Sequence, residues 1–447
     1  MGGAKLEAFK FSLYLAIPIG LTAAVVLRQD VLESIIKSYS YVRYPPSNVT
    51  DDKIQEVAAE ARTAAQVLST QVVPLAATAT TSMVWTSPRR KPAQQPDMRR
   101  CLVTGGAGFL GRHLVGQLLD SGRWDVTVFD VRALEGEERV QYIVGDLRDA
   151  EQVAQACKGM NTVFHVATAA PTAHNTHNEA LMRDVNIGGT QNVIDACVAA
   201  AVPRLVYTSS ASVVFEGKSL VLVDESQPYA SRPMDYYTHT KAEGEGAEKL
   251  VLAANGRGGV AVCALRPSGI FGEYDTLLVA TTVRNAARGK LKYIIGNGRN
   301  EMDWTYAGNV AQAHIEAAEA LTGPDCVLAG KPYFVTNAEP RTFWGFMGDV
   351  CQGMGYDRPH IKLPFALVYF IALVLQMVVV PLLRLVGRDM QSDFTPARIK
   401  ITAVNRTFSC AAASRDFGYK PKVSVDEGLK RTMKHFEHLH ASKQKKL

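Results

Sequence analysis

The sequence predicts an α/β fold in which a doubly wound parallel sheet is joined to a smaller C-terminal substrate-binding part and to membrane-associated segments. Three observations support this prediction. Short apolar runs alternate with helical patterns between about residues 100 and 355, a glycine series follows the first run, and two long stretches carry no charge. Strands that alternate with helices are typical of βαβ units, which build parallel sheets.

Length and composition set the first limits. With 447 residues, the chain exceeds one ordinary domain, so we expect one large domain with extensions or two domains. A composition of 47% hydrophobic and 21% charged residues excludes disorder throughout. The net charge of +6 is concentrated at 89–100 and 443–447, where no aromatic residues are interleaved. This pattern favours phospholipid headgroups over nucleic acid as a partner.

No metal site or disulfide framework is predicted. The seven cysteines are scattered and include no C-x-x-C pair, and the chain contains no H-E-x-x-H motif. A reducing compartment is therefore expected.

Six apolar runs are the predicted strands of the parallel sheet. Each is short and rich in β-branched or aromatic residues. They are RCLVTGG (100–106), DVTVFD (125–130), VQYIVGD (140–146), TVFHVAT (162–168), RLVYTSS (204–210) and AVCALRP (261–267).

The first strand leads into a glycine series. Gly105, Gly108 and Gly111 form a G-x-x-G-x-x-G pattern at the turn from strand to helix. Glycine permits the tight turn and lets main-chain N–H groups approach a pyrophosphate, while the positive end of the helix favours the anion. Glycine-rich turns also occur without ligands, so this motif needs support from another residue.

Asp130 provides that support. It ends the second strand, 19 residues after Gly111, where a carboxylate accepts hydrogen bonds from the adenosine ribose and repels a 2′-phosphate. NAD is therefore favoured over NADP, although Arg132 is placed to pair with a 2′-phosphate. Asp146 and Leu147 end the third strand, where the adenine would lie, but Asp146 taken alone also fits a helix cap.

A tyrosine and a lysine supply the predicted chemistry. Tyr237 and Lys241 are four residues apart, so one helix face carries both. A phenol with a pKa near 10 is a poor base at neutral pH, and a nearby ammonium and a cationic nicotinamide would lower that pKa. Ser210 follows the fifth strand, where a hydroxyl could hold the substrate oxygen while Tyr237 moves its proton. Ser209 and Ser212 flank it closely, so the choice among the three serines stays open.

Pro267 and Ile270 follow the sixth strand. Proline fixes that turn, and main-chain groups beside it could hold the nicotinamide amide. Each of these residues alone has an ordinary structural interpretation, but their joint occurrence in this order favours catalysis. The candidate cofactor-binding residues are Gly105, Gly108, Phe109, Leu110, Gly111, Asp130, Arg132, Asp146, Leu147, Ala167, Tyr237, Lys241, Pro267 and Ile270.

These motifs together resemble the extended short-chain dehydrogenase/reductases, whose sheet is of the Rossmann type. The segments VFHVAT, VNIGGTQNVIDAC, DYYTHTKAEGE and MDWTYAGNVAQAHIEAAEAL resemble the 3β-hydroxysteroid dehydrogenase branch, over roughly residues 99–440. Within that branch, the chain looks most like the enzymes that act on sterol 4α-carboxylates. The resemblance implies that Tyr237 transfers the proton, that Lys241 is its electrostatic partner, and that Ser210 fixes the substrate oxygen.

The implied reaction is the oxidation of a 3β-hydroxy-4α-carboxysterol to the 3-ketone with loss of CO2. A β-keto acid loses CO2 readily, so no metal or further cofactor is needed. One alternative keeps the site and changes the substrate to a 3β-hydroxy-5-ene steroid, a flavonoid or a sugar nucleotide. A second alternative, of another class, is an NAD-binding scaffold subunit without activity.

Two apolar segments indicate a membrane. Residues 11–27 carry no charge, and neither do residues 363–383, which are long enough for a membrane site. The basic tail resembles a dilysine retrieval signal, which points to the endoplasmic reticulum with the catalytic domain facing the cytosol. The expected partners are a sterol, membrane lipid, and a second copy of the chain or a sterol-demethylation complex. The expected parts are a membrane anchor (1–30), a helical and linker extension (31–98), an NAD-binding domain (99–355) and a C-terminal substrate-binding part (356–447).

Overall fold

The structure is a computed structural model, and its described residues all belong to one compact unit, 82–447. The predicted anchor, nearly all of the 31–98 extension and the basic tail lie outside the described residues. The described residues are 84–85, 98–134, 137–170, 178–242, 246–385 and 394–441.

An eight-stranded sheet forms the centre of this unit, in the order β1-β4-β3-β2-β5-β6-β8-β13. All neighbouring strands are parallel except β1 and β4. The six strands predicted from the sequence are confirmed, and β1 and β13 extend the sheet at its two edges. The strands are β1 (Val84–Trp85), β2 (Arg99–Thr104), β3 (Trp124–Asp130), β4 (Gln141–Val144), β5 (Thr162–His165), β6 (Arg204–Thr208), β8 (Ala261–Pro267) and β13 (Lys331–Val335).

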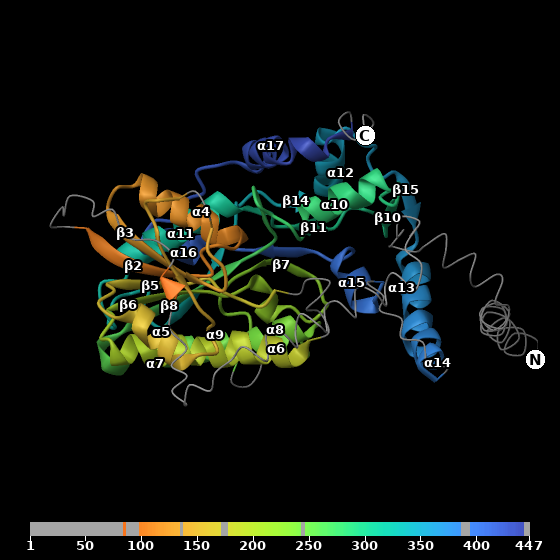
Figure 1. Ribbon diagram of the computed structural model, residues 1–447. Helices are drawn as coiled ribbons and strands as arrows, with labels where there is room; N and C mark the ends of the chain where they lie inside the picture. Colours follow the sequence, from red (N-terminus) through yellow and green to blue (C-terminus); the bar gives the residue numbers. More distant parts are fainter. Residues whose placement is uncertain are drawn as a thin grey trace, which may run out of the picture. The chain divides into compact units, whose positions relative to one another are not determined.

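Helices cover both faces of this sheet (Figure 1). One face packs against α4 (Phe109–Asp120), α11 (Ala307–Ala320) and α16 (Ala411–Phe417), and the other against α5 (Ala150–Cys157), α7 (Gly189–Ala199) and α9 (Ala247–Ala253). The central strands are buried on both sides, which explains why β8 has no exposed residue. Because strand order reverses between β2 and β5, their carboxyl ends flank the crevice where ligands bind in this fold.

The smaller part is assembled from segments far apart in the chain. Its main sheet has the order β14-β11-β16-β7 and draws on residues between 220 and 408. It is completed by two short strand pairs, β10–β15 and β12–β9, and by three helices, α10, α12 and α17. These helices pack around an apolar cluster separate from the core of the central sheet. These elements are β7 (Leu220–Val223), β9 (Ile270–Phe271), α10 (Val279–Ala287), β10 (Tyr293–Ile295), β11 (Glu301–Met302), β12 (Thr305–Tyr306), β14 (Arg341–Thr342), α12 (Phe343–Gly353), β15 (Ile361–Leu363), β16 (Arg406–Phe408) and α17 (Val425–His435).

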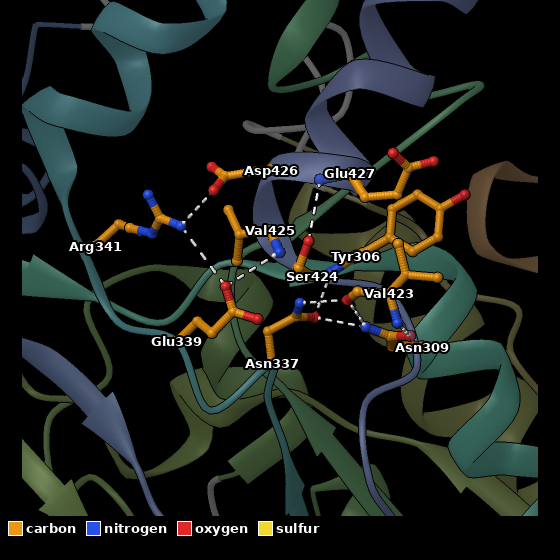
Figure 2. A network of polar contacts seen from close by, with 10 residues as sticks. All are labelled: Tyr306, Asn309, Asn337, Glu339, Arg341, Val423, Ser424, Val425, Asp426 and Glu427. Carbon is orange, nitrogen blue, oxygen red and sulfur yellow. Dashed lines mark hydrogen bonds and ion pairs between the residues drawn. The ribbon is translucent and has the colours of Figure 1, made fainter.

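A buried polar network joins α17 to the main sheet (Figure 2). Asn337, which follows β13, accepts hydrogen bonds from the main-chain N–H of Tyr306 at 3.1 Å and from the amide of Asn309 at 2.9 Å. The amides of Asn337 and Asn309 both donate to the carbonyl of Val423, at 2.8 and 2.7 Å. The loop before α17 is therefore fastened to the end of β13 and to the start of α11.

One apolar helical stretch stands out in the part of the chain that the structure describes. Phe365–Leu383 is long and apolar enough to cross a membrane, and it runs through α13 (Phe365–Val374), the π-helical η4 (Leu375–Val379) and α14 (Val380–Leu385). Leu367, Ile371 and Met377 are 52%, 49% and 72% exposed, whereas Val368 and Ala372 pack against α15 (Pro396–Ile401). One side of this helix therefore presents large apolar side chains.

The remaining elements are short. They are α6 (Glu179–Arg183), the π-helical η1 (Asp184–Gly188), the 3-10 turns η2 (Ala211–Val214), η3 (Arg257–Gly259) and η5 (Glu437–Leu439), and α8 (Tyr236–Ala242).

Candidate active site

The glycine series forms a tight turn between β2 and α4. Gly105 has a φ of +72°, and Gly108 is the N-cap of α4 with no side-chain hydrogen bond to the helix. A Cβ at Gly111 would lie 2.1 Å from the carbonyl oxygen of Gly105, so the helix packs directly on the turn. A Cβ at Gly105 would lie 2.6 Å from the Cα of Ala167, which joins this turn to the loop after β5. Main-chain groups thus line the crevice at the strand reversal, as a pyrophosphate site requires.

The first two residues of α4 differ in their surroundings. Phe109 is partly buried and meets the ring of His113 edge-on, with centroids 5.8 Å apart. Leu110 points into the apolar core and is buried. A contact of Leu110 with a ligand would therefore come from its main chain.

Asp130 lies at the end of β3, beside the glycine turn. Its carboxylate accepts hydrogen bonds from the N–H of Ala107 at 3.0 Å and from the N–H of Arg132 at 3.3 Å. Burial raises the pKa of this carboxyl group, and these hydrogen bonds oppose that shift. The carboxylate is held where a ribose would lie, and the side chain of the exposed Arg132 lies nearby.

Asp146 does not cap a helix. It forms an ion pair with Arg148, and the N-cap of α5 is Asp149, whose carboxylate accepts from the N–H groups of Glu151 and Gln152. Leu147 is buried beside α7. The alternative interpretation of Asp146 as a cap is therefore wrong, because the cap position comes three residues later.

Tyr237 and Lys241 are brought together on α8, as the four-residue spacing predicted. The Nζ of Lys241 lies 5.8 Å from the centre of the Tyr237 ring. It donates hydrogen bonds to the hydroxyl of Tyr207 and to the carbonyl of Thr208, both at 2.9 Å. The ammonium is therefore fixed against the end of β6 and faces the phenol.

Burial is the largest cause of the pKa shifts of Tyr237 and Lys241. Burial raises the pKa of Tyr237 to about 12, whereas a hydrogen bond with Thr168 lowers it. Burial also lowers the pKa of Lys241 to about 7, and the charge of Glu248 opposes that shift. Desolvation is thus the largest influence on the phenol, and the expected lowering of its pKa by an ammonium together with a cationic nicotinamide stays a prediction. A cation held against the Tyr237 ring would act in the opposite direction.

Ser210 is partly exposed, and its hydroxyl is oriented by Ser212. Its oxygen accepts hydrogen bonds from the hydroxyl of Ser212 at 2.9 Å and from the N–H of Ser212 at 3.2 Å. Thr238, next to Tyr237, donates in turn to Ser212 at 3.3 Å. Ser210 can therefore donate its own proton to a substrate oxygen, while Ser212 orients it. The hydroxyl of Ser209 is buried with no partner and belongs to the interior.

Pro267 and Ile270 lie on the neighbouring strand end. The N–H of Ser209 donates to the carbonyl of Leu265 at 2.7 Å, so the ends of β6 and β8 are side by side. Pro267 is the last residue of β8, and Ile270 pairs with Thr305 of β12. This places the loop after β8 beside the segment that carries Ser210.

Three further residues support the site and were not singled out from the sequence. Tyr207 accepts the hydrogen bond from Lys241, and Thr168 contacts Tyr237. Asn186, placed by the π-helical turn η1, accepts from the hydroxyl of Thr168 at 3.0 Å and donates to Thr240 at 3.0 Å. In the sequence, the only signal for Asn186 was that it is a polar residue within VNIGGT. The residues that it hydrogen-bonds are 18 and 54 positions away in the chain.

Comparison with known proteins shows the family of the chain. Residues 102–365 match the model of the 3-beta hydroxysteroid dehydrogenase/isomerase family. The chain is 41% identical over 346 residues to the decarboxylating sterol-4-alpha-carboxylate 3-dehydrogenase of Mus musculus, covering 77% of this chain and 93% of that protein. It is 43% identical over 367 residues to the 3beta-hydroxysteroid-dehydrogenase/decarboxylase isoform 1 of Arabidopsis thaliana, covering 78% of this chain and 82% of that protein.

Solved structures share the fold at lower identity. A dTDP-glucose 4,6-dehydratase from Streptomyces venezuelae, with NAD bound, superposes with a TM-score of 0.58 at 23% identity over 75% of this chain and 96% of that one. A UDP-glucose 4-epimerase from Thermotoga maritima gives a TM-score of 0.57 at 21% identity over 75% and 98%. The central sheet and the smaller C-terminal part therefore form an architecture known from NAD-dependent enzymes.

Proposed function

Because the chain belongs to the 3-beta hydroxysteroid dehydrogenase/isomerase family, we propose that it is an NAD-dependent, decarboxylating sterol-4α-carboxylate 3-dehydrogenase of sterol C4 demethylation. The observation that carries this proposal is the joint presence of Tyr237 and Lys241 on α8, with Lys241 bonded to the carboxyl end of β6, and of Ser210 just after that strand. The family resemblance seen in the sequence is confirmed.

The residues present fit a dinucleotide. Gly105 and Gly111 leave no room for a Cβ, so their main chain forms the wall of the crevice, and the N-terminus of α4 has no side-chain cap. Asp130 would bind the adenosine ribose and Lys241 the nicotinamide ribose. The chemistry that NAD supplies when bound is acceptance of the hydride from C3.

The chain's own residues move the proton. Ser210 donates a hydrogen bond to the C3 oxygen, and Tyr237, as phenolate, takes the proton of the C3 hydroxyl as the hydride leaves C3. The Lys241 ammonium, held by Tyr207 and Thr208, stabilises the negative charge on the phenol oxygen. Tyr237 must therefore be ionised despite its burial, and the positive charge of Lys241 and of an oxidised nicotinamide favour that state.

Decarboxylation follows from the ketone. The C4–carboxylate bond breaks, its electron pair passes into the C3 carbonyl to give an enolate, and CO2 leaves. The enolate then takes a proton at C4 from a donor in the site or from water. Ser210 and the protonated Tyr237 are placed to hydrogen-bond the enolate oxygen.

A turnover assay tests the assignment. Purified protein with NAD and a 3β-hydroxy-4α-carboxysterol is expected to form NADH and CO2 in equal amounts. Tyr237→Phe should lower the rate by about 10²- to 10⁴-fold, because it removes the proton acceptor, and should leave NAD binding intact. Full turnover by Tyr237→Phe would contradict the role of this phenol, and NAD binding without turnover of any sterol would favour a scaffold.

The choice of NAD over NADP is tested at Asp130. Asp130→Ser removes the carboxylate that repels a 2′-phosphate and leaves Arg132 to pair with it. The ratio of kcat/KM for NADP to that for NAD should rise by at least tenfold. An unchanged ratio would show that another residue selects the cofactor.

The proposal includes a membrane site for the apolar helix. The exposed side of Phe365–Leu383 carries large apolar residues, and a sterol substrate partitions into lipid. A lipid-soluble carbene reagent in vesicles is expected to label peptides from 365–383. The exposed but isolated Val327 is the internal control and should stay unlabelled. Label at Val327 with none on 365–383 would contradict the membrane site.

We place the chain at the endoplasmic reticulum membrane, with its catalytic domain facing the cytosol. The support is the basic tail, with Lys443 and Lys445 at the spacing of a dilysine signal. Protease added to sealed microsomes should then digest the catalytic domain. Protection of that domain would place it in the lumen.

A further inference from the structure

A cationic surface lies where the apolar helix begins. Residues 276–300 and 358–385 contain lysine and arginine but no carboxylate. The first segment forms α10 and β10, and the second forms β15 and the helix that starts with α13. The basic surface consists of five exposed residues of α10, of the turn after it and of β15, namely Arg284, Arg288, Lys290, Lys292 and Lys362.

Strand pairing brings these two segments together. β10 and β15 are parallel, with Ile294 opposite Lys362. The carbonyl of Lys292 accepts hydrogen bonds from the N–H groups of His360 and Ile361, both at 3.0 Å. Lys292 and Lys362 are far apart in the sequence but lie on neighbouring segments, beside the start of α13 (Figure 1).

Exposed apolar side chains share this location. Tyr293 lies opposite Ile361 in the strand pair, and the two are 47% and 39% exposed. The N–H of Gly296, just after β10, donates to the carbonyl of Leu363 at 2.8 Å, and a Cβ at Gly296 would lie 3.9 Å from the Cβ of Phe365. The strand pair therefore contacts the first residue of the helix. A tyrosine at such a place is typical of the boundary between water and lipid, because its ring is apolar and its hydroxyl is polar.

Charge is confined to one end of the apolar helix. Lys362 is the last charged residue before it, and residues 363–383 carry none. On α15, the Nζ of Lys400 lies 5.6 Å from the ring centre of Tyr369, in the second turn of α13. Cations at one end of an uncharged helix match a layer of headgroups beside a layer of hydrocarbon.

Local structure explains only part of the basic surface. Its two arginines lie at the C-terminal end of α10, where positive charge interacts favourably with the helix dipole. Lys292 and Lys362 lie outside that helix, so the dipole does not account for them. Glu301 and Asp357, at the borders of the two segments, are exposed and offset part of the charge, and the surface remains positive.

We propose that the basic surface binds the phosphate-bearing headgroups of anionic phospholipids and sets the depth at which the start of α13 enters the membrane. This inference rests on the proposed membrane site of Phe365–Leu383. The basic side chains contact the headgroups from the water side, while Tyr293 and Ile361 lie at the boundary with the acyl chains. A nucleic acid would leave these apolar side chains in water, so the combination of charge and apolar surface favours lipid.

Binding of the full chain to two kinds of vesicle tests this inference. Vesicles of phosphatidylcholine alone are neutral, and vesicles of phosphatidylcholine and phosphatidylserine in equal parts are anionic. The ratio of the two dissociation constants measures the preference for anionic headgroups. The triple variant Lys290→Gln, Lys292→Gln, Lys362→Gln should lower this preference by about tenfold to a hundredfold, because each basic residue near an anionic surface contributes about fivefold. High salt should remove the difference between the variant and the wild type, since it screens the charges.

A second triple variant matches the change in net charge. Lys158→Gln, Lys331→Gln, Lys430→Gln replaces three exposed lysines, at the end of α5, on β13 and on α17, and should keep the wild-type preference. Thermal unfolding of both variants should stay close to that of the wild type, because all six side chains are exposed.

The outcomes separate the headgroup site from the membrane site. A wild-type preference in the first triple variant would overturn the inference, and so would an equal loss in both variants, which would reduce the effect to net charge. Binding to neutral vesicles in either case would leave the membrane site intact. Absence of binding to every vesicle would instead contradict the membrane site itself.

Discussion

The ammonium of Lys241 donates a 2.9 Å hydrogen bond to the hydroxyl of Tyr207, a buried phenol on β6. The Lys241 Nζ also lies 4.6 Å from the centre of the Tyr207 ring, so this residue holds the lysine by a hydrogen bond and by its π face. The lysine is thereby directed at the Tyr237 ring and not at solvent. Tyr207 therefore positions Lys241 within the pair that we propose to be catalytic.

Tyr207→Phe should lower kcat by about tenfold, because the buried ammonium loses an acceptor. The hydroxyl favours the charged form of Lys241, so its loss should move the pKa of Lys241 further below about 7. The limb of the pH profile of kcat/KM that reports Lys241 should shift to lower pH. Tyr333→Phe on β13 is the control, since its hydroxyl bonds Asp416 away from this pair. An unshifted limb in Tyr207→Phe would show that the ring alone positions Lys241.

Two glycines of α4 should respond in opposite ways to alanine. Gly111→Ala forces a Cβ to within 2.1 Å of the Gly105 carbonyl, so the cofactor turn must open. We expect weaker NAD binding by at least tenfold and a loss of about 1–3 kcal/mol of stability. Gly116→Ala meets open space on the same helix and should stabilise by up to about 1 kcal/mol. Titration calorimetry with NAD and thermal unfolding measure both effects, and equal behaviour of the two variants would contradict the packing argument.

The network in Figure 2 contains both buried and exposed polar contacts, so the stability that each kind contributes can be compared. Asn337→Leu leaves the buried N–H of Tyr306, the amide of Asn309 and the carbonyl of Val423 without this partner, and should destabilise by about 2–4 kcal/mol. Arg341→Met breaks an ion pair with Asp426, whose side chain is 73% exposed, and should change stability by less than about 1 kcal/mol. Denaturant unfolding compares the two. A larger loss of stability in Arg341→Met than in Asn337→Leu would contradict this expectation.

Asp303 should make stability depend on pH. Burial raises its pKa from 3.8 to about 6, so the folded state favours the protonated carboxyl group. The contribution of Asp303 to the free energy of unfolding is greatest below pH 4 and is lost as the pH rises through 6. The difference in unfolding free energy between wild type and Asp303→Asn should therefore fall by about 2 kcal/mol between pH 4 and pH 7. A constant difference across this range would show that the pKa of Asp303 is the same in both states.

Much of the site could be predicted from local patterns. The six strands are short apolar runs between helical segments, and the glycine turn and the Tyr237–Lys241 spacing each lie within one stretch of chain. Their structure follows from sterics and from the 3.6-residue period of a helix, which neighbouring residues alone decide. The function class follows from the same motifs taken together.

The supporting residues could not be predicted in this way. Tyr207 meets Lys241 across 34 residues, and Asn186 meets Thr240 across 54. Such pairs depend on how strands from distant segments are ordered in the sheet, which no local period encodes. The same is true of the effect of burial on the pKa of Tyr237, because burial is a property of the packed structure.

The sequence by itself determined the parallel sheet, the glycine turn and the position of Tyr237 and Lys241 on one helix, because these depend on residues close together in the chain. Only the tertiary structure decided that Ser209 is buried, what holds Lys241, and that Arg406 of β16 lies against the ring of Phe215. The physical reason is that hydrogen-bond partners and desolvation are set by contacts between segments as much as 190 residues apart, which form only when the chain is folded.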